Sequence, residues 1–165
     1  MNRRNYFPDF SYLLRTRHRP SVWANILGSA NYPEITGSAR FYETDYGVFV
    51  ITEVRGLPEP NIECREPIFA FHIHDGDSCG GEGESPFPGA GMHYNPYGCP
   101  HPYHAGDMPP LFSAGGLAYS AFLTDRFTIS EIVGKTVIIH SAPDDFTTQP
   151  SGNPGEKIAC GEIVR

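Results

Sequence analysis

The feature that most limits how this chain can fold is the segment from Asp75 to Pro110, which is too rich in glycine, proline and histidine to form a strand or a helix. A loop of this length in a compact domain normally has a function or a ligand that holds it. Every histidine except His18 lies in this segment or in a predicted strand. We therefore expect a metal ion to order the loop.

The rest of the chain has the pattern of short strands separated by turns. Apolar residues alternate from Val22 onward, Gly115 and Gly116 predict a hairpin turn, and no segment of useful length has the period of a helix. Strands at this spacing favour an all-β fold, an antiparallel β-sandwich. The eight predicted strands are 22–27, 35–43, 47–54, 68–74, 111–113, 117–123, 136–140 and 157–164.

One of these strands separates two kinds of side chain. Because side chains alternate along a strand, Phe69, Phe71 and Ile73 are expected to face the core. His72 and His74 then project from the opposite face and can bind one metal ion together. The pair by itself is also compatible with two half-exposed histidines on a strand surface.

The composition suits one soluble globular domain. The chain has 165 residues, of which 39% are hydrophobic and 19% are charged, a size and composition typical of a single core. Its formal net charge of −7 disfavours nucleic acid or an anionic membrane as a partner. No run approaches the roughly 20 apolar residues that a membrane-spanning helix needs.

Residues 1–20 are interpreted as an N-terminal extension and residues 21–165 as the folded domain. The basic residues of the extension are interleaved with others such as Tyr6 and Asp9, and no apolar run follows them. This pattern does not resemble a secretory signal, so we expect a cytoplasmic protein. The alternative is that the sequence is an already processed product.

A second set of potential metal ligands has the spacing H-x7-H-x2-H-x2-D and comprises His93, His101, His104 and Asp107. Three imidazoles and one carboxylate form a closed tetrahedral set of the kind that binds zinc. If His93 presents both ring nitrogens, it can bind zinc on one side and a second metal on the other, which requires loss of its second proton. The sequence therefore predicts a two-metal site with a histidine bridge.

These motifs, taken in order, resemble those of the copper/zinc superoxide dismutase family. The resemblance extends over about residues 21–165. It implies an eight-stranded antiparallel Greek-key β-sandwich or barrel, immunoglobulin-like, with a long metal-binding loop. The matching segments are Phe71–His74, Gly91–Pro96, His101–Asp107, Val137–His140, Asp144–Asp145 and Gly152–Gly161.

The resemblance also implies roles for individual side chains. Asp144 would link His72 to His101 as a carboxylate behind the metal ligands. Cys79 and Cys160 would form a disulfide, with two reduced thiols as the alternative in a cytosolic protein. Copper would be held by His72, His74, His93 and His140, and zinc by His93, His101, His104 and Asp107.

The other two cysteines are expected to be unpaired. Cys64 precedes the strand 68–74 at the end far from the metal loop, so at about 3.3 Å per residue it should lie roughly 20 Å from that loop. Cys99 closely precedes His101 and could be an accidental ligand, but we favour an ordinary loop thiol.

By the same resemblance, the expected activity is conversion of superoxide to dioxygen and hydrogen peroxide by redox cycling of copper, with His93 as both ligand and proton carrier. The substrate channel departs from the family pattern. Lys157 occupies the position of the family's anion-guiding arginine and keeps its charge without the planar fork. Residues 146–155 are shorter than the family's charged guiding loop and contain no lysine or arginine. We therefore expect weaker steering and a lower rate than in typical members.

Two other functions fit parts of the pattern. One is a copper/zinc-binding or copper-delivery protein without enzymatic activity, and the other is a structural sandwich whose zinc orders the loop. Retention of His72, His74 and His140 argues against the structural role, because zinc alone would not need them. Lys157 and the short channel loop keep the delivery role open.

Many members of the resembling family form dimers. The resemblance therefore also implies a homodimer as one possible oligomeric state.

Overall fold

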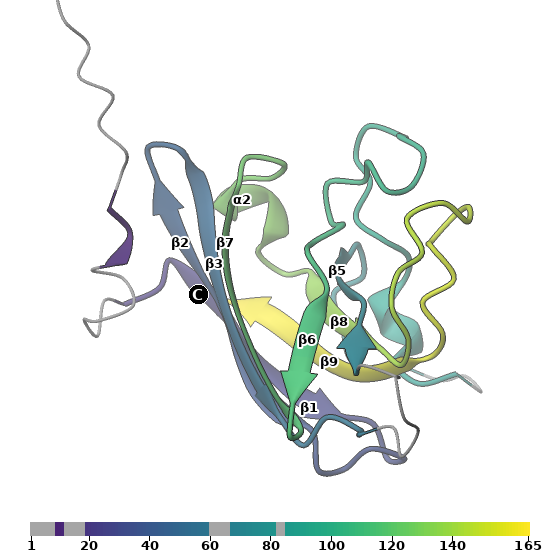
Figure 1. Cartoon of the computed structure of the whole chain (residues 1–165). Coiled ribbons are helices and arrows are strands. Elements are labelled where there is room, and N and C mark those ends of the chain that lie inside the picture. The colour runs from purple at the N-terminus through teal and green to yellow at the C-terminus, as the bar shows by residue number, and fades with distance from the viewer. Residues whose placement is uncertain (1–8, 12–18, 60–66, 82–84) are drawn as a thin grey trace, which may run out of the picture.

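The computed structural model describes residues 9–11, 19–59, 67–81 and 85–165. These residues form an antiparallel β-barrel around one main core (Figure 1). No helix within these ranges is long and apolar enough to cross a membrane. The elements are β1 (Val22–Gly28), β2 (Thr36–Thr44), β3 (Gly47–Arg55), β4 (Ile68–Phe69), β5 (Phe71–His74), η1 (Pro88–Ala90), β6 (Leu111–Ala114), β7 (Leu117–Thr124), α2 (Ile129–Ile132), β8 (Thr136–His140) and β9 (Lys157–Val164).

The barrel is closed by one short segment that contributes to both ends of the sheet. The strand order is β4-β6-β7-β3-β2-β1-β9-β8-β5, and β4 and β5 are separated only by Ala70. β4 pairs with β6, whereas β5 pairs with β8. The chain therefore changes partner within a few residues and joins the two ends of the sheet.

This change of partner explains why the structure has one strand more than the sequence predicted, whereas the other predicted strands differ only by a residue or so at their ends. The predicted strand 68–74 is two strands, because Ala70 leaves the β4 pairing and turns toward the end of β8. Its N–H donates to the carbonyl of Ala142 at 2.9 Å, and its carbonyl accepts from the N–H of His140 at 3.0 Å. Within the part of the chain that the structure describes, the barrel thus has nine strands rather than eight, and the predicted antiparallel all-β fold is confirmed.

The core follows the alternation of the strands. Val22, Ala24 and Ile26 of β1 are completely buried, and Phe71 and Ile73 of β5 lie in the same cluster. The inward direction predicted for the apolar residues of segment 68–74 is therefore confirmed. The histidines of this segment consequently point away from the barrel core, toward the long loop.

A second, smaller apolar cluster lies apart from the main core. It consists of Tyr42 on β2 and Phe49 and Ile51 on β3. Phe10, from the N-terminal extension, packs on this cluster and stacks on Phe49 with ring centroids 5.0 Å apart. At least this part of the extension therefore contacts the barrel.

The connection between β7 and β8 contains the short helix α2, which the sequence pattern did not predict. A helix over Ile129–Ile132 is too short to show a helical period. It is instead marked by a capping box, in which Thr128 and Glu131 bond to each other's backbone. Ile129 and Ile132 face the core and fix the connection against the barrel.

Two long loops lie on the same side of the barrel, remote from β2 and β3 (Figure 1). The first is the glycine-rich and proline-rich segment 75–110, and the second is segment 141–156 between β8 and β9. The predicted disulfide between Cys79 and Cys160 is present and ties the first loop to β9. This bond joins residues 81 positions apart in the chain.

Removal of the disulfide is expected to destabilise the protein substantially. A closed loop of 81 residues corresponds to about 4 kcal/mol of unfolding free energy in the chain-entropy description. The Cys79→Ser/Cys160→Ser double variant should therefore unfold at a clearly lower urea concentration than the unaltered protein. Cys99→Ser is the matched control, because Cys99 is a free thiol. Equal midpoints for the double variant and this control would contradict the expectation.

Candidate metal centre

The two histidines of β5 are buried beneath the long loop. His72 is 0% exposed and His74 is 2% exposed. The pair is therefore not made of half-exposed surface residues, which was the alternative left open by the strand pattern. His140 ends β8, the neighbour of β5, and is also buried.

The long loop is fastened to β5 by its backbone. The N–H of Ile73 donates to the carbonyl of Gly106 at 2.9 Å, and the carbonyl of Ile73 accepts from the N–H of Tyr94 at 2.8 Å. These bonds place His93 opposite His74 and Asp107 opposite His72 in two isolated antiparallel bridges. The loop therefore delivers its ligand side chains beside the β5 histidines.

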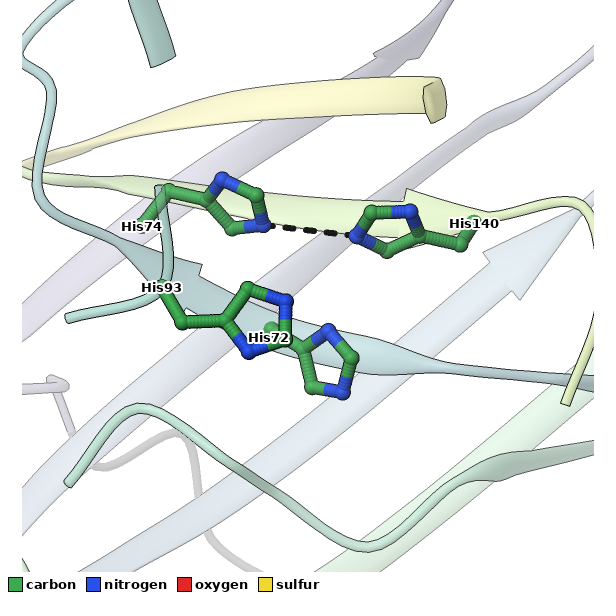
Figure 2. Close-up of side chains that lie close together, drawn as sticks. All are labelled: His72, His74, His93 and His140. Carbon is green, nitrogen blue, oxygen red and sulfur yellow. Dashed lines mark hydrogen bonds between the residues drawn. The ribbon is translucent and has the colours of Figure 1, made fainter. Parts of the chain in front are cut away.

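Two groups of potential ligands result, and they share His93. Within each group, the candidate ligand atoms all lie within 4.8 Å of one another. Figure 2 shows the rings of the first group converging from β5, β8 and the loop. The first histidine group comprises His72, His74, His93 and His140, and the second histidine group comprises His93, His101, His104 and Asp107.

Backbone carbonyls orient two rings of the first histidine group, those of His74 and His140. His74 donates from Nδ1 to the carbonyl of Gly91 at 2.9 Å, and His140 from Nδ1 to the carbonyl of Gly155 at 3.3 Å. Their Nε2 atoms consequently face each other, 3.3 Å apart (Figure 2). Nδ1 of His72 and Nε2 of His93 are buried and have no hydrogen-bond partner. Buried ring nitrogens that lack a protein partner and face one another fit a set of metal ligands.

The second histidine group brings its ring nitrogens around a carboxylate. Nδ1 of His93 lies 2.8 Å from Oδ1 of Asp107, and Nδ1 of His104 lies 3.4 Å from Nδ1 of His93. Nδ1 of His101 is 3.1 Å from Oδ2 of Asp107 but makes no hydrogen bond. Three imidazole nitrogens and a carboxylate in this arrangement fit a closed zinc site. His93 thus directs one nitrogen to each group.

The carboxylate of Asp144 connects the two groups, because it bonds to one histidine of each. Oδ2 accepts from Nε2 of His72 at 2.9 Å, and Oδ1 accepts from Nε2 of His101 at 2.8 Å. Each bond leaves the Nδ1 atom of the ring directed to its group. Gly152, which has a positive φ of 76°, lies against this link, and a Cβ there would collide with both Asp144 and His101. Only glycine therefore fits at this position without displacing the link.

Burial makes the rings of His74 and His140 poor bases. Desolvation lowers the pKa of His74 well below its usual value and lowers the pKa of His140 to about 3. Burial alone would raise the pKa of Asp144, but hydrogen bonds, led by that from His72, lower it to about 2. At neutral pH, therefore, His74 and His140 are neutral and can offer a lone pair to a metal ion, while Asp144 is an anion.

Lys157 lies beside the first histidine group at the start of β9. Nζ donates to the carbonyl of Phe87 at 3.2 Å and to that of Gly91 at 3.0 Å. The carbonyl of Gly91 also accepts from His74. Lys157 is thus joined through one carbonyl to a ring of the first histidine group, and burial lowers its pKa.

The other residues considered in the sequence belong to neither histidine group or lie outside the described residues. Cys99 has a free thiol and belongs to neither histidine group. His18 and Cys64 lie outside the described residues, so their predicted roles stay predictions. The residue patterns did not indicate Gln149, whose side chain bonds to both the N–H and the carbonyl of His101. Its only sequence signal was its position in the short channel loop.

Comparison with known proteins identifies the family. The profile described as "Copper/zinc superoxide dismutase (SODC)" matches residues 35–163, which is most of the chain. The chain belongs to the copper/zinc superoxide dismutase family. A relative from Aquifex aeolicus, "Superoxide dismutase [Cu-Zn] 2", is 36% identical over an aligned length of 146, and the match covers 79% of this chain and 80% of that protein. A second, "Superoxide dismutase [Cu-Zn]" from Photobacterium leiognathi, is 34% identical over 77% of this chain and 78% of its own length.

A solved structure supports the fold of this family member. "Cu/Zn superoxide dismutase from Brucella abortus" superposes with a TM-score of 0.69 and covers 85% of this chain and 97% of its own. The two chains are 22% identical in sequence. The similarity therefore shows a shared fold.

Loss of the Asp144 carboxylate is expected to weaken metal binding in both groups. Asp144→Asn removes one of two acceptors, so the ring of His72 or His101 loses its partner and its orientation. A carboxylate behind metal-ligating histidines typically contributes about 10-fold to 100-fold in metal affinity. Chelator competition for copper and zinc measures this loss. Asp145→Asn is the matched control, because Asp145 bonds to the exposed Thr147 and Thr148; equal affinities in the two variants would contradict the expected role.

Proposed function

We propose that this protein is a superoxide dismutase that converts two superoxide anions and two protons to dioxygen and hydrogen peroxide. The observation that carries this proposal is the position of His93, which directs Nε2 toward the first histidine group and Nδ1 toward the second. In this proposal, the first histidine group holds copper and the second holds zinc. The donor chemistry fits both metals, because imidazole suits copper and a carboxylate completes a zinc set.

Copper, when bound, supplies the one-electron redox chemistry by which one superoxide is oxidised and another is reduced. The protein holds the metal-binding nitrogens of three rings in fixed positions. It does so because the other nitrogen of each ring bonds to Asp144 or to the carbonyl of Gly91 or Gly155. His93 supplies the atom at which a proton can be held and released. Its Nε2 has no protein partner, while its Nδ1 stays beside Asp107.

Lys157 is the positive group that we assign to anion attraction near the first histidine group. An ammonium has three N–H donors, and carbonyls of the loop take two of them. One donor and the charge therefore remain for an anion. The chain as a whole has a formal net charge of −7, and the loop 146–155 contains no lysine or arginine. This balance supports an enzyme whose rate lies below the diffusion-limited class.

Activity should depend on the first histidine group. The protein is loaded with copper and zinc, and superoxide decay is measured beside His140→Ala and beside protein loaded with zinc alone. We expect metal-dependent decay in the unaltered protein and a loss of most of it in His140→Ala, because one nitrogen of the set is removed. Decay no faster than that of an equal concentration of free copper would contradict the proposed activity and favour a metal-binding role.

Replacing Lys157 tests the assigned anion guide. Lys157→Arg keeps the charge and offers five donors in place of three, so it should raise kcat/KM at low ionic strength. Lys157→Gln removes the charge and should lower both kcat/KM and its dependence on salt. Stopped-flow measurement of superoxide decay over a salt series separates these effects. If neither variant changes the rate or the salt dependence, Lys157 does not guide the substrate.

A further inference from the structure

An arginine outside both histidine groups holds the backbone of the second one. Arg126 lies between β7 and α2. Its Nη1 donates to the carbonyl of Pro102 at 3.1 Å, to that of His104 at 3.4 Å and to that of Asp107 at 3.2 Å. Two of these carbonyls belong to residues of the second histidine group.

The segment that carries Arg126 is anchored to the barrel on both sides. Its backbone N–H donates to Oγ1 of Thr124, at the end of β7, at 3.2 Å. The next residue, Phe127, is 2% exposed and packs edge-on against Phe41 with ring centroids 6.3 Å apart. The capping box of α2 begins at Thr128. Arg126 therefore extends toward the loop from a backbone with little freedom.

The carbonyls that Arg126 contacts require a positive partner. Three oxygen atoms that converge on one nitrogen bring the negative ends of three dipoles together, which is unfavourable without a charge between them. Nη1 has only two hydrogens, so the three bonds are shared and the full charge of the guanidinium contributes. A groove of about 340 Å³, lined by residues that include Pro102, Met108 and Phe122, lies at this junction of loop and barrel. Arg126 and Asp107 are themselves among the residues that line this groove.

The bonds from Arg126 act on the turn that presents two ligands. Within this turn, the N–H of Asp107 donates to the carbonyl of His104 at 3.2 Å, and the N–H of His104 donates to Oδ2 of Asp107 at 3.1 Å. The turn is thus a compact unit, and the guanidinium shares the carbonyl of His104 with this turn while it also holds the carbonyl of Asp107. Movement of Arg126 would shift His104 and Asp107 together.

We propose that Arg126 is a positioning residue for zinc, which fixes the turn that presents His104 and Asp107 without contacting the metal itself. This inference rests on the proposed assignment of zinc to the second histidine group. Arg126 bonds to no backbone carbonyl of His72, His74 or His140 in the described contacts. Replacement of Arg126 should therefore lower the affinity for zinc and leave the affinity of the first histidine group for copper unchanged.

The experiment compares Arg126→Gln and Arg126→Lys with the matched control Arg55→Gln, which breaks only a surface pair with Glu53. Zinc affinity is measured by chelator competition, copper affinity is measured in parallel, and Co²⁺ in the zinc site reports ligand geometry by its visible spectrum. We expect Arg126→Gln to lower zinc affinity about tenfold, to alter the Co²⁺ spectrum and to leave copper affinity unchanged. Arg126→Lys should restore part of the zinc affinity, because it keeps the charge with fewer donors.

Two results would overturn the inference. One is zinc affinity and a Co²⁺ spectrum in Arg126→Gln that match those of Arg55→Gln. The other is an equal loss of both metals together with a lower urea midpoint of the metal-free protein, which would indicate a general structural role. Failure of the unaltered protein to bind zinc at all would instead refute the proposed function, and the inference with it, so the two failures are distinguishable.

Discussion

The backbone of Ile73 is the contact on which the metal centre depends. Its N–H and carbonyl both bond to the long loop, and its side chain is buried in the barrel core. Because side chains alternate along a strand, an inward Ile73 forces His72 and His74 outward, beneath the loop. The same residue therefore sets the direction of two histidines and the position of the loop that brings the others. Core packing and ligand geometry are coupled at one residue of β5.

Around this contact, the groups that do not face the metal sites determine how the ligands are presented. An imidazole has two nitrogens, and the partner of one nitrogen decides where the other points. Asp144 accepts a hydrogen bond from one nitrogen of His72 and one of His101, which directs their other nitrogens toward the ligand groups. The carbonyls of Gly91 and Gly155 do the same for His74 and His140. His93 differs, because its Nδ1 is beside Asp107 and its Nε2 has no partner. This difference suits a ring that serves two sites.

Much of the fold and of the candidate site could be predicted because side-chain chemistry is visible in a sequence. Period-two alternation indicated the strands, and the histidine and aspartate spacing indicated the second histidine group. The complete first histidine group came from the resemblance to a known family, and the barrel brings both groups together. Backbone contributions were not visible, since any residue can offer a carbonyl. The acceptors at Gly91 and Gly155 were therefore missed, as was the change of partner at Ala70. Helix α2 was missed because four residues show no period.

The way the loop lies along β5 also determines what happens to the backbone edge of that strand. β5 has a true strand, β8, on one side only, and on the other side its backbone bonds to loop residues such as Tyr94 and Gly106. The loop thus occupies the place of a missing neighbour strand. A chain whose loop has left β5 exposes unpaired N–H and C=O groups that a second chain can pair with. The contacts that bring the candidate ligands together therefore also cover the hydrogen-bonding edge of β5.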